Sequence, residues 1–145
     1  MRNRQVTIAE RLCVLSRANM EAAEIVMPKI KNPEMQARVK EQLRRSSAVH
    51  EKAERLLREQ KPGGSAKTNA AERLRGRIFR FRARFSRNPQ RISRLLRRET
   101  VQRMGILGRM VDLFPDSSLK SRALAEEYLM LQQRYLEGLS AEFWP

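Results

Sequence analysis

Arginine side chains dominate the middle of this chain, and their guanidinium groups are well suited to binding phosphate. Residues 63–103 contain thirteen Lys and Arg but only two acidic residues, Glu72 and Glu99, so this segment supplies +11 of the net charge of +15. Twelve of the thirteen cations are arginine, whose planar group can hold a phosphate through two parallel hydrogen bonds. Because such a charge block repels itself in a folded protein, it indicates a polyanionic partner.

Eight of these arginines are our candidates for contact with an anion. They begin in a stretch, residues 79–85, where apolar residues and arginine alternate, and they continue past the Asn-Pro pair at 88–89. The candidates are Arg80, Arg82, Arg84, Arg87, Arg91, Arg94, Arg97 and Arg98.

The alternation in this stretch fits either a strand or a helix. A strand would place Phe on one face and Arg on the other. A helix would align Leu74, Ile78, Phe81 and Phe85 in a single apolar stripe. Because the flanking segments have helical patterns and a lone strand would have no partner, we predict a helix whose Phe side chains face the core.

Several partners would suit the basic surface. We expect nucleic acid or another polyanion, bound in a strongly salt-dependent way through counterion release. No helix-turn-helix or zinc-finger pattern indicates reading of a base sequence. The alternatives are an acidic protein partner and a solvated face that only confers solubility. A membrane surface ranks lower, although a basic helix with Phe is typical of interfacial helices, because the helix would have to leave the bundle or turn Phe79 outward.

The elements that position these residues are amphipathic helices. Thr7 and Glu10 form a capping box, and the Asn-Pro pairs at 32–33 and 88–89 are typical of helix starts. Four long stripes of helical period are separated by turns, and the Pro-Gly-Gly run falls within 61–67. We therefore predict one all-α domain over residues 1–145. Its expected form is a four-helix bundle of two helical hairpins, with a crossover linker at 61–67 and a short additional helix before the third long one.

This layout resembles small bacterial ferritin-like proteins of unknown function. The resemblance rests on the Glu-Ala-Ala-Glu run at 21–24, the turn at 29–34, the Gly-Gly linker and the second hairpin. It implies a ferritin-like four-helix bundle. A di-iron centre in such a bundle requires a Glu-x-x-His pair from each of two helices. Here Ser47 replaces the Glu that would precede His50, and Glu99 is followed by Gln102. Since the chain has one His, we expect the di-iron centre to be missing.

Any metal site would have to be a remnant. Its weak candidates are His50, Glu21, Glu24 and Glu99. The simpler interpretation of His50 is a core or boundary histidine that bonds to Ser, Glu or backbone. We expect no cofactor and no enzymatic activity, because phosphate loops, nucleophile elbows and Cys-x-x-Cys pairs are missing from the sequence.

The presence of only one cysteine in the sequence bears on the cellular compartment of the protein. Cys13 has no partner for an intramolecular disulfide, so we expect a cytoplasmic protein. No apolar run approaches the roughly 18 residues that span a bilayer. The aromatic pair at 143–144 would cover the end of the bundle, or it would form a homodimer contact or a docking motif.

Overall fold

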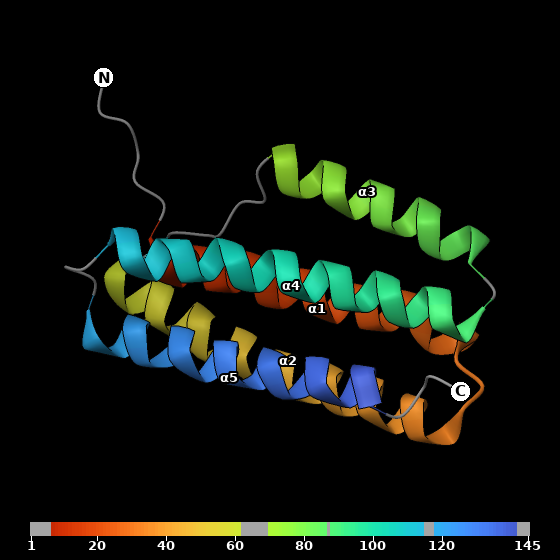
Figure 1. Cartoon of the computed structure of the whole chain (residues 1–145). Coiled ribbons are helices and arrows are strands. Elements are labelled where there is room, and N and C mark those ends of the chain that lie inside the picture. The colour runs from red at the N-terminus through yellow and green to blue at the C-terminus, as the bar shows by residue number, and fades with distance from the viewer. Residues whose placement is uncertain (1–6, 62–69, 87, 115–117, 142–145) are drawn as a thin grey trace.

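The structure is a computed structural model that describes residues 7–61, 70–86, 88–114 and 118–141. Within these ranges every regular element is a helix, which confirms the all-α prediction for them. Most of the predicted linker at 61–67 and the aromatic pair at 143–144 lie outside the described residues. The helices are α1 (Ile8–Val26), η1 (Met27–Lys29), α2 (Pro33–Gln60), α3 (Ala70–Phe85), α4 (Pro89–Leu113) and α5 (Leu119–Ala141) (Figure 1).

Three of the helices begin at the caps that the sequence predicted. Thr7 Oγ1 accepts a hydrogen bond from the backbone N–H of Glu10 at 3.1 Å. Asn32 Oδ1 accepts from the N–H of Glu34 at 2.9 Å, and Asn88 caps α4 in the same way. Proline occupies the first turn of both α2 and α4, where its missing N–H costs nothing.

Four of the helices surround a common core, and α3 lies outside them. Helices α1, α2, α5 and α4 contact one another in that cyclic order, and α1 also contacts α5 across the middle. Figure 1 shows α1 and α5 running in one direction and α2 and α4 in the other. Helix α3 returns the chain from one end of the assembly to the other. Among the described α-helices it contacts α1 and α4, and Lys29 of η1 bonds to its C-terminal end.

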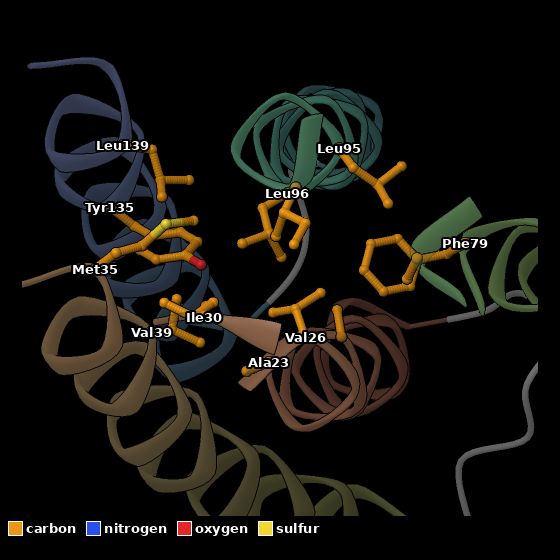
Figure 2. Packing of buried hydrophobic residues seen from close by; sticks show 13 residues of the cluster. Ala23, Val26, Ile30, Met35, Val39, Phe79, Leu95, Leu96, Tyr135 and Leu139 are labelled. Atoms are coloured by element: carbon orange, nitrogen blue, oxygen red, sulfur yellow. The ribbon is translucent and has the colours of Figure 1, made fainter. Parts of the chain in front are cut away.

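The core consists of two apolar clusters with polar side chains between them. One cluster lies where α1 meets η1 and includes Val26, Phe79 and Leu96 (Figure 2). The other lies near the start of α1 and includes Leu12 and Leu107. In the polar layer, Gln42 of α2 donates to the side-chain oxygen of Gln132 of α5 at 2.7 Å, and both residues are buried.

Helix α3 faces the core with a different side from the one predicted. The expected core stripe is exposed, by 57% at Leu74, 41% at Ile78, and 66% at both Phe81 and Phe85. We call these four residues the α3 ridge. From residue 72 onward, the buried side chains of α3 are instead Glu72, Phe79 and Ala83. The prediction of an inward stripe was therefore wrong for this helix. The ridge and the Glu72 face lie on opposite sides of the helix, and the Glu72 face supplies the carboxylate that pairs with a buried arginine.

Candidate functional site

The described members of the predicted anion-binding set are all on the surface. Arg87 lies outside the described residues, and the other seven are exposed. The exposed seven are Arg80, Arg82 and Arg84 of α3 and Arg91, Arg94, Arg97 and Arg98 of α4.

The arginines of α3 lie on two flanks, one on each side of the α3 ridge. Arg73, Arg77 and Arg80 line a cleft against α1, and Arg84 shares their flank because it lies one turn beyond Arg80. Arg75 lines a hollow against α4 instead. Two helical turns further on, Arg82 shares that second flank.

The arginines of α4 add a further row beside the second flank of α3. Arg91, Arg94 and Arg98 are spaced so that they fall along one strip of α4, whereas Arg97 lies nearer the side that faces α5. The structure therefore places six of the seven described residues on three strips, with Arg97 apart from them and the apolar α3 ridge between two of the strips. Helical spacing separates the strips, but it does not show which strip lies beside α1 or α4, because that depends on which face of α3 is buried.

A cleft of about 280 Å³ separates α3 from α1. Arg17 of α1 joins the arginines of the first α3 flank on its walls, together with the carboxylates of Glu21 and Glu72. Arg80 Nη2 lies 3.8 Å from Glu21 Oε2, and both side chains are more than half exposed. Sequence reasoning did not include Arg17, because nothing in the pattern brings this part of α1 beside α3.

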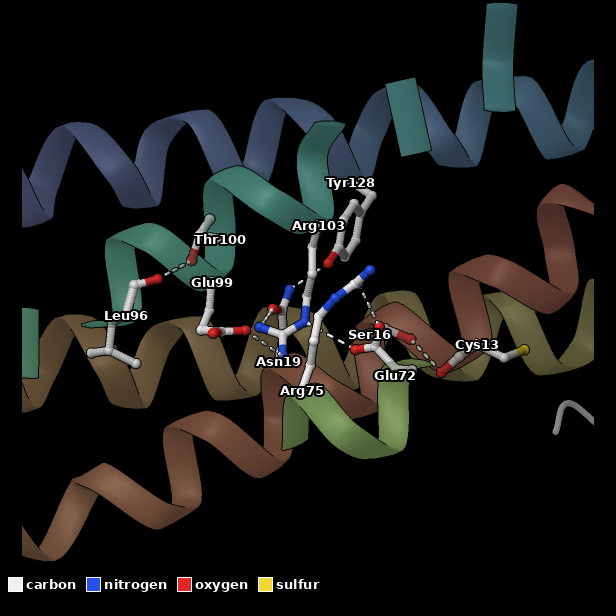
Figure 3. A network of polar contacts seen from close by, with 10 residues as sticks. All are labelled: Cys13, Ser16, Asn19, Glu72, Arg75, Leu96, Glu99, Thr100, Arg103 and Tyr128. Atoms are coloured by element: carbon white, nitrogen blue, oxygen red, sulfur yellow. Dashed lines mark hydrogen bonds and ion pairs between the residues drawn. The ribbon is translucent and has the colours of Figure 1, made fainter. Parts of the chain in front are cut away.

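Beneath α3 a buried polar cluster surrounds the guanidinium group of Arg103 (Figure 3). Arg103 has a side chain only 4% exposed, with Nη2 lying 3.5 Å from Glu99 Oε2 and Nε lying 3.6 Å from Glu72 Oε1. Its Nη1 donates to Asn19 Oδ1 at 3.3 Å, and the Asn19 amide donates to the Tyr128 hydroxyl. Residues from α1, α3, α4 and α5 therefore meet at one buried cation.

Charge balance in this cluster depends on two carboxylates and two arginines. Arg75 Nη1 donates to Glu72 Oε2 at 3.0 Å. Glu72 therefore pairs with one arginine of its own helix, Arg75, and with one arginine of α4, Arg103. Burial raises the pKa of the Glu99 carboxyl, while the positive charge of Arg103 acts in the opposite direction. The sequence did hold a signal for Arg103, because it lies one turn before Leu107 on the apolar face of α4.

The other end of α3 is held by a lysine. Lys29 Nζ in η1 donates to the backbone carbonyl of Ala83, and it lies 3.4 Å from the carbonyl oxygen of Ser86. A cation at this position satisfies the last carbonyls of the helix and suits the negative end of its dipole. Together with buried Phe79, this contact fixes the orientation in which α3 presents its ridge outward.

The weak metal-ligand candidates do not come together. Glu21 pairs with Arg80, Glu99 faces Arg103, and Glu24 is exposed on α1. His50 Nε2 lies 2.6 Å from Glu54 Oε1. Within the described residues, no three His, Cys, Asp or Glu side chains form a group that could hold a metal ion.

His50 also contacts a serine, which gives a Ser-His-Glu arrangement. Its Nδ1 lies 3.0 Å from Ser16 Oγ and 3.1 Å from the carbonyl oxygen of Cys13. Ser16 is fully buried and its hydroxyl donates to the backbone carbonyl of Leu12. A nucleophilic serine must reach a substrate carbonyl beside an oxyanion site, and this hydroxyl is enclosed within a helix pair. The trio is therefore a hydrogen-bond network that joins α1 to α2 and runs from buried Ser16 to the partly exposed Glu54.

Comparison with known proteins does not assign this chain to a family. No protein-family model, no curated protein and no solved structure matches it. None of the helices in the described ranges combines the length and the apolar character that crossing a membrane requires.

Proposed function

We propose that this protein is a non-enzymatic accessory protein that binds phosphate-bearing polyanions through the arginines of α3 and the first half of α4. The observation that carries this proposal is the exposure of all seven described candidate arginines in a segment whose net charge is +11. Arg84, Arg91 and Arg98 are among those that project from the surface. Guanidinium groups arranged in rows can contact successive phosphates, and each contact releases counterions.

The proposal includes a fold without a metal centre. We infer that α1, α2, α4 and α5 form a ferritin-like four-helix bundle, with α3 as the short additional helix on its outside. Their cyclic contacts and the return of the chain along α3 support this arrangement. In the middle of this bundle, the Arg103 guanidinium provides the positive charge for two carboxylates, as a metal ion would. The single buried Cys13 suits the cytoplasm, which we include in the proposal.

A binding titration tests this function directly. Fluorescence anisotropy would follow binding to a mixed-sequence DNA duplex and a single-stranded RNA between about 50 and 300 mM salt. The test variant replaces Arg80, Arg84, Arg91 and Arg94 with Gln. The control variant removes the same number of charges from exposed arginines elsewhere, by replacing Arg44, Arg55, Arg58 and Arg134 with Gln.

We expect tight binding with a steep salt dependence, which the test variant flattens and the control variant preserves. Each lost phosphate contact should reduce the slope of log K against log salt by about 1. An absence of binding to these polymers and to anionic vesicles at about 100 mM salt would mean that the arginines only form a solvated face. Equal losses in the two variants would mean that total charge, rather than this surface, determines binding.

A further inference from the structure

We infer that the polyanion is an anionic lipid bilayer, and that α3 docks on it with its ridge in the interface and its arginines on the lipid phosphates. This inference rests on the proposed function, because it names the partner of the same arginines. Three features of the described residues carry it: the outward apolar ridge, the arginines on both of its flanks, and the outer position in which α3 is anchored.

The first feature is the apolar ridge. Leu74, Ile78, Phe81 and Phe85 follow helical spacing and are all between 41% and 66% exposed. The rings of Phe81 and Phe85 contact each other, with centroids 4.9 Å apart. A continuous apolar stripe along a surface helix loses the stabilisation that burial would give it, so it indicates a surface that is covered in use.

The second feature is the charge on either side of the ridge. Arg73 and Arg77 lie toward α1 and Arg75 lies toward α4. Helical spacing places Arg84 on the first of these flanks and Arg82 on the second. An amphipathic helix at a bilayer surface has this arrangement, with apolar residues below the headgroups and arginines reaching sideways to phosphates. The row on α4, which includes Arg91 and Arg98, adds charge beside the same surface.

The third feature is the position of α3 in the fold. Figure 1 shows α3 lying outside the other helices, so a flat surface that approaches from this side meets α3 first. Its inner face is held by its own buried Phe79 and by the pair of Glu72 with Arg103 of α4, and Lys29 of η1 bonds to its C-terminal end. The helix therefore does not have to leave the bundle to present its ridge, which removes the objection to a membrane surface that the sequence had raised.

Other occupants fit these features less well. A single-stranded nucleic acid needs flat aromatic platforms, but two of the four ridge residues are aliphatic and the planes of Phe81 and Phe85 are tilted by 60°. A second copy would bring together two chains of net charge +15, with arginine flanks facing each other. A bilayer needs no complementary groove, because lipid headgroups move apart around a convex ridge.

Vesicle co-sedimentation of the full chain tests this inference. The vesicles are phosphatidylcholine alone, or phosphatidylcholine mixed with phosphatidylglycerol, and the DNA duplex and RNA above are measured in parallel. The ridge variant replaces Ile78, Phe81 and Phe85 with Ser. Its matched control replaces three exposed apolar residues outside α3, Leu113, Leu119 and Met130, with Ser. Circular dichroism checks that both variants stay helical, and gel filtration without lipid reports their oligomeric state.

We expect binding to the anionic vesicles, with the ridge variant weakening it by at least about 30-fold and the control changing it less than about twofold. A second readout is a Phe81→Trp substitution, whose added fluorescence over the parent chain should be quenched by brominated lipid. This quenching distinguishes insertion of the ridge from adsorption by charge.

The outcomes separate the two proposals. If the four Arg→Gln changes abolish vesicle binding but the ridge variant binds as the parent does, the ridge inference fails and the proposed function stands. The ridge inference also fails, with the proposed function intact, if the chain prefers DNA or RNA to vesicles. If the ridge variant changes a dimer into a monomer without lipid, or if only an acidic polypeptide such as polyglutamate binds, the ridge serves a protein contact and the lipid inference fails. If no polyanion binds, both proposals fail.

Discussion

Phe79 and Phe81 are two residues apart on α3 and point in opposite directions, one 2% exposed in the core and the other 66% exposed. On a helix, two positions in sequence correspond to a rotation of about 200°. Because Phe79 faces the core, the α3 ridge, which includes Phe81, faces outward. The same orientation brings Glu72 to the buried Arg103, since Glu72 and Phe79 are two turns apart on the same face.

Replacing each phenylalanine with alanine tests this orientation. Phe79→Ala should lower the free energy of unfolding by about 3–5 kcal/mol, because it removes a buried ring and leaves a cavity. Phe81→Ala should change it by no more than about 0.5 kcal/mol, because that ring is largely in solvent. Urea unfolding followed by circular dichroism measures both. The reverse order would show that the stripe predicted from the sequence faces the core after all.

Stability should depend on pH through Glu99. Because burial raises its pKa above the ordinary value of 4.5, the folded chain holds this proton over a pH range in which the unfolded chain has lost it. The stabilisation is complete below the unfolded pKa and is lost as pH rises through the folded pKa. The surrounding charges are Glu72, Arg75, Arg98 and Arg103.

The Glu99→Gln variant cannot ionise at this position, so it isolates this effect. Its free energy of unfolding should increase relative to the parent chain as pH rises above the ordinary pKa of 4.5, and the difference should level off once pH has passed the folded pKa. Urea unfolding of both proteins at a series of pH values gives the difference. A difference that decreases as pH rises would contradict the assigned direction of the pKa shift.

The thiol of Cys13 should be unreactive in the folded protein. Burial raises its pKa from 9.0 to about 11, and the side chain is 1% exposed. At pH 8 the thiolate fraction should therefore be about 100-fold lower than in the unfolded chain, before any loss of access is counted. Labelling with Ellman's reagent, with and without denaturant, measures the ratio. Equal rates would place Cys13 at the surface.

Helix existence and helix starts were predictable because they depend on local chemistry. The caps at Thr7, Asn32 and Asn88 each use a side chain and backbone groups within three residues, so the sequence contains all the necessary information. The face that α3 buries was not predictable in this way. It depends on Arg103, a residue of another helix, and the apolar period of α3 contains no sign of that partner.

The exposure of the described candidate arginines could be predicted from the sequence, but their arrangement on the surface could not. Counting charge identified the arginines, and exposure of Arg80 and Arg98 agrees with that choice. The charge count of the basic segment also includes Arg103, which was not among the eight candidates and whose side chain is buried. The cleft that joins Arg17 to the flank of α3 is a contact between distant segments, which spacing along the chain cannot indicate.

The buried Arg103 should be needed to hold α3 in place. Arg103→Ala leaves Glu72 and Glu99 buried without their shared cation, which should lower the free energy of unfolding by about 3–5 kcal/mol. Arg109→Ala, at an exposed position on the same helix, is the matched control and should change it by no more than about 0.5 kcal/mol. A triple variant with Arg103→Met, Glu72→Gln and Glu99→Gln should recover most of the lost free energy of unfolding, because no unpaired charge then remains buried. Urea unfolding measures all three proteins. If Arg103→Ala is as stable as the control, the guanidinium group does not join α3 to the other helices.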